Sequence, residues 1–105
     1  MITTHVLDVA QGRPAAGVSV TLEVQQGESW RPVGQGATDG DGRLRTLWPP
    51  GAPLSAGTYR LRFDTRGRSD FFPEVTVVFR VSDPAAHHHV PLLLSPFGYS
   101  TYRGS

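Results

Sequence analysis

The sequence contains no cysteine, no lysine and no asparagine among its 105 residues. The absence of cysteine excludes disulfide bonds, thiolate catalysis and any zinc site that depends on cysteine ligands. Because lysine is absent, all ten basic residues other than histidine are arginine. Each individual arginine therefore carries less functional information than usual.

An excess of charge of one sign is also lacking, since ten basic residues face nine acidic ones and the net charge is +1. Nucleic acids and anionic membranes both call for a clear basic excess, so we expect neither as a partner. No apolar run approaches transmembrane length, and the first ten residues, MITTHVLDVA, lack the basic and apolar regions of a signal peptide. These absences predict a cytoplasmic protein without membrane contact.

Glycine and proline are abundant, with 12 and 9 residues, and they divide the chain into short segments. Several of these segments alternate apolar and polar residues, as half-buried strands do. The clearest is TYRLRFDT, in which Tyr59, Leu61 and Phe63 share one face. Seven or eight such segments predict an all-β fold, a two-sheet sandwich that forms a single domain over residues 1–105.

Two segments, one near each end of the chain, carry apolar residues on both faces. In the later segment Leu92 lies on one face, whereas His89 and Leu93 lie on the other. In the first segment His5 shares a face with Leu7. A sandwich strand normally exposes one face to water, so a second subunit is expected to cover the outer face of these strands. The histidines would then line a subunit interface.

All four histidines lie in two segments, THVLD near the start and AHHHVPLL near the end. One interpretation is that they are surface or hydrogen-bonded strand residues. A second is a metal site, with His87 and His89 projecting the same way and His5 as a third ligand, but a carboxylate or water would have to complete it. A third is acid–base catalysis, because the unperturbed histidine pKa of about 6.5 lies near neutrality. The residues alone leave all three open.

Other polar residues are ambiguous when taken singly. Arg43 follows the tight turn TDGDG and could be a solvated arginine. Tyr102, Arg103 and Ser105 lie at the end of the chain, where residues commonly fray. No G-x-S-x-G motif supports a serine hydrolase, and no glycine pattern matches a phosphate loop or dinucleotide site.

Five segments taken together resemble the 5-hydroxyisourate hydrolases, the transthyretin-related enzymes of purine catabolism. The segments are THVLD, GRP at residues 12–14, TDGDGR at residues 38–43, FFPEV at residues 71–75, and HVPLLLSPFGYSTYRGS at residues 89–105. The resemblance covers essentially the whole chain. The final YRGS is its most specific part, because it distinguishes these hydrolases from transthyretin, the hormone carrier of the same fold.

The resemblance implies a transthyretin-like β-sandwich subunit in a homotetramer, a dimer of dimers with active sites in the channel between the dimers. It implies no metal and no cofactor. The catalytic residues that it implies are His5, Arg43 and His89. The substrate-binding residues that it implies are Tyr102, Arg103, Gly104 and Ser105. His87 matches the family's other histidine, which has a lesser role.

The sequence departs from the family at two places. His88 stands where the family usually has tyrosine, and the connection at residues 63–71 is short, so the helix found there in the family is expected to be short or absent. At the end of the chain, Tyr102 is expected to share a face with His89. Arg103 and the Ser105 carboxylate are expected to anchor the last turn by charge-assisted hydrogen bonds.

The implied reaction is hydrolysis of 5-hydroxyisourate to 2-oxo-4-hydroxy-4-carboxy-5-ureidoimidazoline in urate degradation. Water loses a proton as it attacks the carbonyl and the leaving nitrogen gains one, and histidine can perform both transfers. Arg43 would hold the substrate and stabilise charge on the carbonyl oxygen. The main alternative is a non-catalytic carrier that binds a small ligand in the same channel, as transthyretin does. A structural sandwich or adhesion module is a third candidate, but it would not account for the placement of the histidines.

Overall fold

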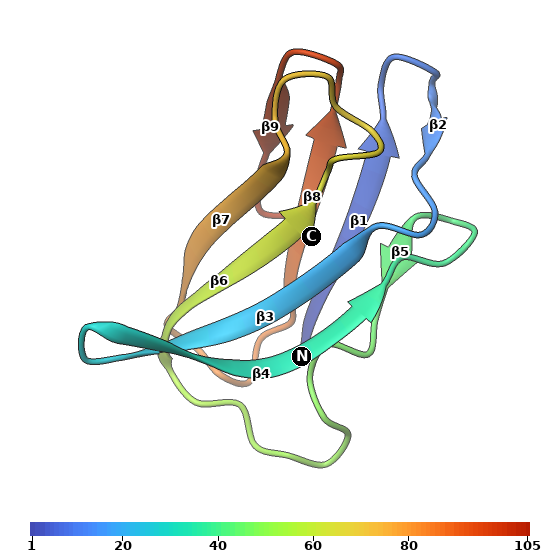
Figure 1. Cartoon of the computed structure of the whole chain (residues 1–105). Helices are drawn as coiled ribbons and strands as arrows, with labels where there is room; N and C mark the ends of the chain where they lie inside the picture. Colours follow the sequence, from blue (N-terminus) through green and yellow to red (C-terminus); the bar gives the residue numbers. More distant parts are fainter.

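The computed structural model describes all 105 residues, and it contains nine strands and no helix. The strands form two sheets that face each other (Figure 1). Their bounds are Ile2–Asp8 (β1), Arg13–Pro14 (β2), Ser19–Gln26 (β3), Ser29–Ala37 (β4), Arg43–Leu44 (β5), Gly57–Asp64 (β6), Glu74–Val81 (β7), His88–Leu94 (β8) and Tyr99–Thr101 (β9). The structure has no helix that is long and apolar enough to span a membrane.

The first sheet has the order β2-β1-β8-β9, and β5 also pairs with β1. The second sheet has the order β4-β3-β6-β7. Strands β1 and β8 run parallel, whereas every other pair is antiparallel. The parallel pair joins the two ends of the chain, so the surface that they share forms only when the tertiary fold is complete.

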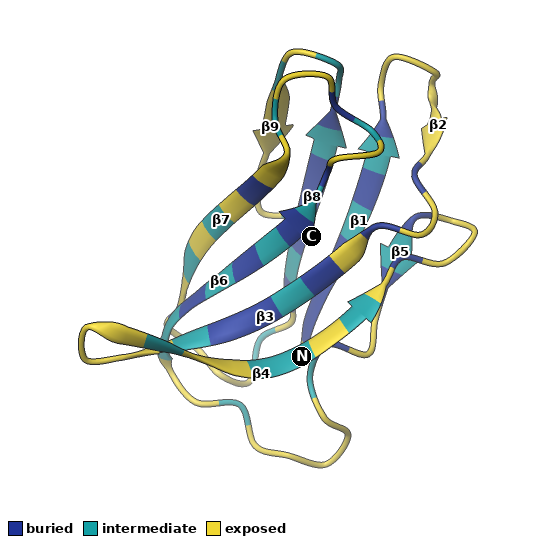
Figure 2. Ribbon diagram, viewed as in Figure 1, coloured by how far each residue is buried: buried dark blue, intermediate teal, exposed yellow.

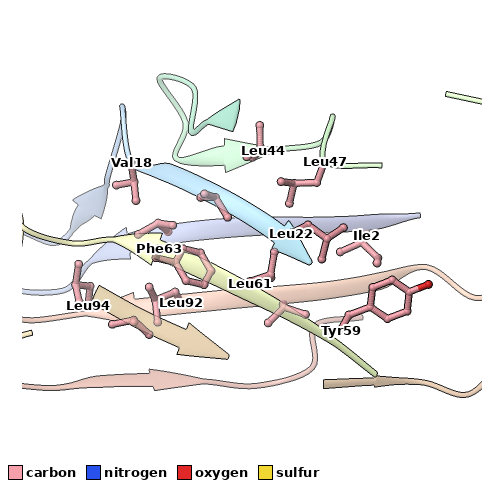
Figure 3. Close-up of a cluster of buried hydrophobic side chains, with 14 of the residues drawn as sticks. Ile2, Val18, Leu22, Leu44, Leu47, Tyr59, Leu61, Phe63, Leu92 and Leu94 are labelled. Atoms are coloured by element: carbon pink, nitrogen blue, oxygen red, sulfur yellow. The ribbon is translucent and has the colours of Figure 1, made fainter. Parts of the chain in front are cut away.

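The core lies between the two sheets and is built mainly from alternate residues of β1, β3, β6, β7 and β8 (Figure 2). Tyr59, Leu61 and Phe63 of β6, which the period-two pattern places on one face, are 1%, 0% and 0% exposed. Figure 3 shows them together with Leu22 of β3 and Leu92 of β8. Truncating a ring such as that of Phe63 to alanine typically costs about 3–5 kcal/mol. The core confirms the predicted all-β sandwich.

The structure has more strands than the seven or eight expected. The difference arises at Arg13 and Pro14, where the sequence predicts only a turn. These two residues pair with Asp8 and Leu7 of β1 and form the short strand β2. A strand of two residues is too short to show the alternation of apolar and polar residues, so the sequence pattern could not predict it.

The connection between β6 and β7 contains no helix, as expected. The backbone N–H groups of Arg68 and Ser69 both donate to the carbonyl of Thr65, which makes a single turn. The Thr65 hydroxyl donates to the carbonyl of Phe72, and the Ser69 hydroxyl donates to the carbonyl of Pro96 at 3.0 Å. Side-chain hydrogen bonds therefore hold this connection against the sandwich.

The end of the chain continues along β8 beyond β9. Strand β9 pairs with Leu92–Leu94, and Gly104 then bridges His89 in the same antiparallel register. Pro91 lies between the two pairings and has no N–H to donate to a ladder. Its carbonyl instead accepts a hydrogen bond from the Thr101 hydroxyl at 2.7 Å. The last residues are thereby brought beside His89.

Candidate active site

The outer face of the first sheet gathers polar side chains from three strands. Thr3 of β1 pairs with His89 of β8, and His5 of β1 pairs with Arg43 of β5. Paired residues project to the same side of a sheet, as do residues two apart on one strand. The register thus brings Thr3, His5, Arg43 and His89 to one face.

A hollow of about 160 Å³ lies on this face. Its lining residues are Met1, Thr3, Thr4, Arg43, Arg45, His87, His89 and Ser105. His5 does not line the hollow itself but pairs directly with Arg43 at its border. Because two arginines and no acidic side chain line the hollow, it suits an electron-rich or anionic ligand.

The His5 ring is oriented by a backbone group. Its Nε2 lies 2.8 Å from the carbonyl oxygen of Asp41. A carbonyl can only accept a hydrogen bond, so Nε2 carries the hydrogen. In the neutral ring, Nδ1 is then the nitrogen with the free lone pair, and it is available for proton transfer.

One turn, at residues 39–43, holds both the Asp41 carbonyl and Arg43. The Asp39 carboxylate accepts hydrogen bonds from the backbone N–H groups of Asp41 at 2.9 Å and Arg43 at 3.0 Å. The bond from the Arg43 backbone is the main cause that lowers the pKa of Asp39. Gly42 has φ of +76°, and a Cβ there would overlap with the carbonyl oxygen of Val6. The turn therefore fixes His5 and Arg43 together.

The His89 ring is held from two sides. The Thr3 hydroxyl oxygen lies 2.8 Å from His89 Nδ1 and 2.8 Å from His87 Nε2. On the other side the ring packs on Gly104, where a Cβ would overlap with His89 Cδ2. The backbone N–H of Gly104 also donates to the His89 carbonyl at 2.8 Å. These contacts leave Nε2 of His89 without a hydrogen-bond partner within the chain.

The charge state of His89 follows from its surroundings. Burial lowers the pKa of His89, and Arg43, then His87 and His5, lower it further. A histidine with a lowered pKa is neutral at pH 7, as a proton acceptor must be.

The last four residues divide between two places. Ser105 lines the hollow with His89 and Arg43, and Gly104 supports the His89 ring. Tyr102 and Arg103 line a second hollow of about 220 Å³, which they share with His89, His88 and residues of β7.

The expected anchoring of the last turn by charged groups is wrong. Arg103 and Ser105 form no ion pair and no side-chain hydrogen bond. The backbone bond between Gly104 and His89 fixes the end of the chain instead. An exposed ion pair contributes little to stability because water screens it. The backbone hydrogen bond between Gly104 and His89 instead extends the pairing of a sheet that is already formed.

His88 projects to the opposite face from His89, into the sandwich. It is 4% exposed, and its Nδ1 has no hydrogen-bond partner. His88 is therefore buried and lies away from the hollow. No group of three or more histidine, aspartate or glutamate side chains is close enough together to hold a metal ion.

The sequence did not single out Thr3 or Asp39. The available signal for Thr3 was its place two residues before His5, on the same face of one strand. The signal for Asp39 was the D-G-D-G pattern, in which an aspartate side chain caps the backbone of its own turn.

Comparison with known proteins decides the family. The sequence profile of the HIUase/Transthyretin family matches residues 2–104. The chain belongs to the HIUase/Transthyretin family. Within the family, 5-hydroxyisourate hydrolase of Salmonella typhimurium is 45% identical over 111 residues, which cover 100% of this chain and 81% of that protein. Uric acid degradation bifunctional protein TTL of Arabidopsis thaliana is 50% identical over 119 residues, which cover 99% of this chain but only 37% of the plant protein.

Solved structures of the HIUase/Transthyretin family superpose on the whole sandwich. The 5-hydroxyisourate hydrolase of Klebsiella pneumoniae gives a TM-score of 0.83 at 36% identity and covers 99% of this chain and 98% of its own. Sea bream transthyretin in complex with thyroxine gives a TM-score of 0.87 at 30% identity and covers 98% and 93%. The comparisons confirm the predicted family and fold. Because one fold carries both proteins, function must be argued from the site.

Proposed function

We propose that this chain hydrolyses 5-hydroxyisourate to 2-oxo-4-hydroxy-4-carboxy-5-ureidoimidazoline in urate degradation. One observation carries the proposal: the register of β1, β5 and β8 brings His5, Arg43 and His89 to one face beside a basic hollow. The 45% identity with the Salmonella hydrolase over the whole chain supports it. A carrier needs no pair of oriented proton-transfer groups.

The two histidines suit proton transfer because each is oriented through one ring nitrogen. His5 uses Nε2 for the Asp41 carbonyl, and His89 uses Nδ1 for the Thr3 hydroxyl. His5 Nδ1 and His89 Nε2 are left for the substrate and water. Between them, the histidines accept the proton that the attacking water loses and donate a proton to the leaving nitrogen as the ring C–N bond breaks.

Arg43 supplies the charge that the reaction needs. Water attack on the carbonyl carbon moves negative charge to the carbonyl oxygen, and a fixed guanidinium stabilises that charge more in the transition state than in the substrate. Arg43 forms no ion pair with an acidic side chain, so its charge is not already neutralised.

The remaining site residues are proposed from the family pattern and from their places in the structure. We assign substrate contacts to the last residues of the chain, Tyr102, Arg103, Gly104 and Ser105. Ser105 lines the hollow, Gly104 touches His89, and Tyr102 and Arg103 border His89 from the second hollow. The reaction as proposed uses no metal and no cofactor.

We also propose that the active form is a homotetramer, a dimer of dimers in which this face lines a channel. Leu7 and Leu93 are only partly buried in the single chain although both are apolar and share the face of the histidines. The hollow of about 160 Å³ is smaller than the roughly 300 Å³ at which enclosed ligand sites begin. A second copy over this face would cover the leucines and enclose the site.

The decisive experiment follows the ultraviolet absorbance of freshly generated 5-hydroxyisourate with and without the protein, in the presence of a chelator. We expect faster decay with the wild type. His5→Asn, His89→Asn and Arg43→Gln should each reduce kcat/KM by about 10²–10³-fold. The matched control is Arg66→Gln, because Arg66 pairs with Asp64 on the other sheet. An unchanged decay rate with wild-type protein would contradict the proposal.

The carrier function is the second candidate, because sea bream transthyretin was solved with thyroxine and has the same fold. Calorimetric titration with thyroxine separates the two functions. A hydrolase that is not a carrier should give no saturable heat. Tight saturable binding without hydrolysis would favour the carrier.

A further inference from the structure

Thr3 links two histidines through a single hydroxyl group. Its oxygen lies 2.8 Å from both His87 Nε2 and His89 Nδ1. Thr3 is only 4% exposed, so water has little access to this hydroxyl. The two imidazole rings are its only side-chain partners.

A hydroxyl carries one hydrogen, and this number limits the arrangement of the two rings. Thr3 cannot donate to His87 and His89 at the same time. If it donates to His89 Nδ1, then the hydrogen of a neutral His89 lies on Nε2, and His89 has no free lone pair for the substrate. If it donates to His87 Nε2, then His89 Nδ1 must donate to the threonine oxygen, and Nε2 of His89 is free to accept a proton.

The charges around the site favour the second arrangement. The charged and titratable groups that face His89 are Arg43, Arg45, His5 and His87 on the side of the hollow, and Tyr102 and Arg103 on the side of the second hollow. Arginine can only donate hydrogen bonds, so both arginines of the hollow favour a lone pair on Nε2, and an Nε2 hydrogen would find an acceptor on this surface only at Ser105 or Thr4. His87 is exposed, so its Nδ1 can keep a hydrogen that solvent satisfies while its Nε2 accepts from Thr3.

We propose that Thr3 is a positioning residue that donates its hydrogen to His87 and thereby holds His89 as the Nδ1–H tautomer, with Nε2 as the proton acceptor. This inference rests on the proposed hydrolase function for its role in turnover. The attacking water forms a bond to the carbonyl carbon and gives its proton to His89 Nε2. The imidazolium that results still donates from Nδ1 to the threonine oxygen, and it later returns the Nε2 proton when the C–N bond breaks.

The first test compares two substitutions at Thr3. Thr3→Val keeps the shape but removes the hydroxyl, and Thr3→Ser keeps the hydroxyl. Thr3→Val should lower kcat by about 10- to 100-fold, a part of the usual 10²–10⁴-fold effect of general acid–base catalysis, because the required tautomer is no longer enforced. The KM should change little and the acid limb of the kcat/KM profile should move. Thr3→Ser should restore kcat to within a few-fold of wild type.

The matched control is Thr65→Val. Thr65 is also fully buried, and its hydroxyl donates to a carbonyl far from the histidines. This variant should lose stability without any change in the pH profile. A purely structural role for Thr3 would make Thr3→Val behave in the same way, and that result would overturn the proposal.

A second test reads the tautomer directly and does not depend on activity. Two-bond ¹H–¹⁵N spectra of the histidine rings in the wild-type protein should show hydrogen on Nδ1 of His89, and in Thr3→Val a mixture of tautomers. In addition, the double variant His87→Ala/Thr3→Val should have the same kcat as Thr3→Val alone. Both substitutions break the same hydrogen-bonded series His87–Thr3–His89, so their effects on kcat should not add. Finding the Nε2–H tautomer in wild type would refute the inference even if the protein is a hydrolase. A correct tautomer without hydrolysis would instead remove the proposed function.

Discussion

At Gly104 the lack of a side chain decides where the His89 ring lies. Any Cβ there would overlap with the ring, although the backbone conformation itself does not require glycine. Gly104→Ala should therefore push the ring away and lower kcat by about 10²-fold, the usual scale for a displacement near 1 Å. Steady-state kinetics measure this effect. Gly67→Ala is the control, because nothing lies within 4 Å of a Cβ at that position. Equal activity of the two variants would show that Gly104 has no positioning role.

His88 is one of two histidines, with His89, whose lowered pKa should make the protein less stable in acid. Burial, and then Arg103, lowers the pKa of His88 below the unfolded value of 6.5. The unfolded chain therefore binds a proton more readily than the folded protein. The stability from neutral His88 is complete above about pH 6.5 and is lost as the pH falls from there toward the lower folded pKa.

His88→Tyr should reduce this acid sensitivity. Tyrosine does not take up a proton in this range, and the second hollow beside residue 88 offers space for the larger ring. Urea unfolding at pH 7.5 and pH 5.5 should show a smaller loss of unfolding free energy in the variant than in wild type. Activity at pH 7.5 should be nearly unchanged, because the ring faces away from His89. The same loss in both proteins would mean that other groups cause the acid sensitivity.

At the scale of elements, the turn at residues 39–43 acts as one unit that serves two strands. Asp39→Ala removes the acceptor for two backbone N–H groups and so frees both the Asp41 carbonyl and Arg43. We expect kcat/KM to fall by about 10-fold or more through this misplacement. Asp39→Asn, which keeps an oxygen acceptor, should be milder.

Asp83→Ala is the matched control for the Asp39 substitutions. Its carboxylate accepts a hydrogen bond from the N–H of Ala85 in the turn before β8, and Asp83 does not line the hollow. The kinetics of this variant should equal those of wild type. If Asp83→Ala and Asp39→Ala are equally active, the turn has no special part in the site.

The terminal segment is the second element on which the site depends. Deleting residues 102–105 removes the Gly104–His89 bond, the glycine under the His89 ring and one wall of the hollow. Most hydrolytic activity should be lost, while the β-rich circular dichroism spectrum is kept because β9 ends at Thr101. Hydrolysis of 5-hydroxyisourate by the truncated protein at the wild-type rate would show that the other strands suffice.

For the whole molecule, the prediction concerns assembly. Leu93 shares the outer face with His89 and is only partly buried in one chain. In the proposed tetramer, Leu93→Glu would bury a charge without a partner, which costs several kcal/mol, roughly 2–7 even for a neutral polar group. Light scattering should show tetramers for wild type and smaller species for the variant. Gln35→Glu, on an exposed position of the other sheet, should remain tetrameric. A wild-type monomer with full activity would refute the tetramer.

The sequence by itself determined the architecture and the family. Alternation with period two placed Tyr59, Leu61 and Phe63 in the core, because that pattern depends only on the local geometry of a strand. The motifs gave the candidates His5, Arg43 and His89, because each motif is a short continuous segment that can be recognised without knowledge of the fold.

Only the tertiary structure decided how these residues meet. The alternation of residues along a strand predicts which face of the sheet a side chain lies on. It does not predict which strand pairs with it or in which register. The parallel pairing of β1 with β8 places Thr3 opposite His89, across 86 positions of sequence. That pairing gives one threonine hydroxyl two histidine partners, and it buries His88 while it exposes His87. The hydrogen-bond roles of the rings follow from these contacts between distant segments, which no local pattern contains.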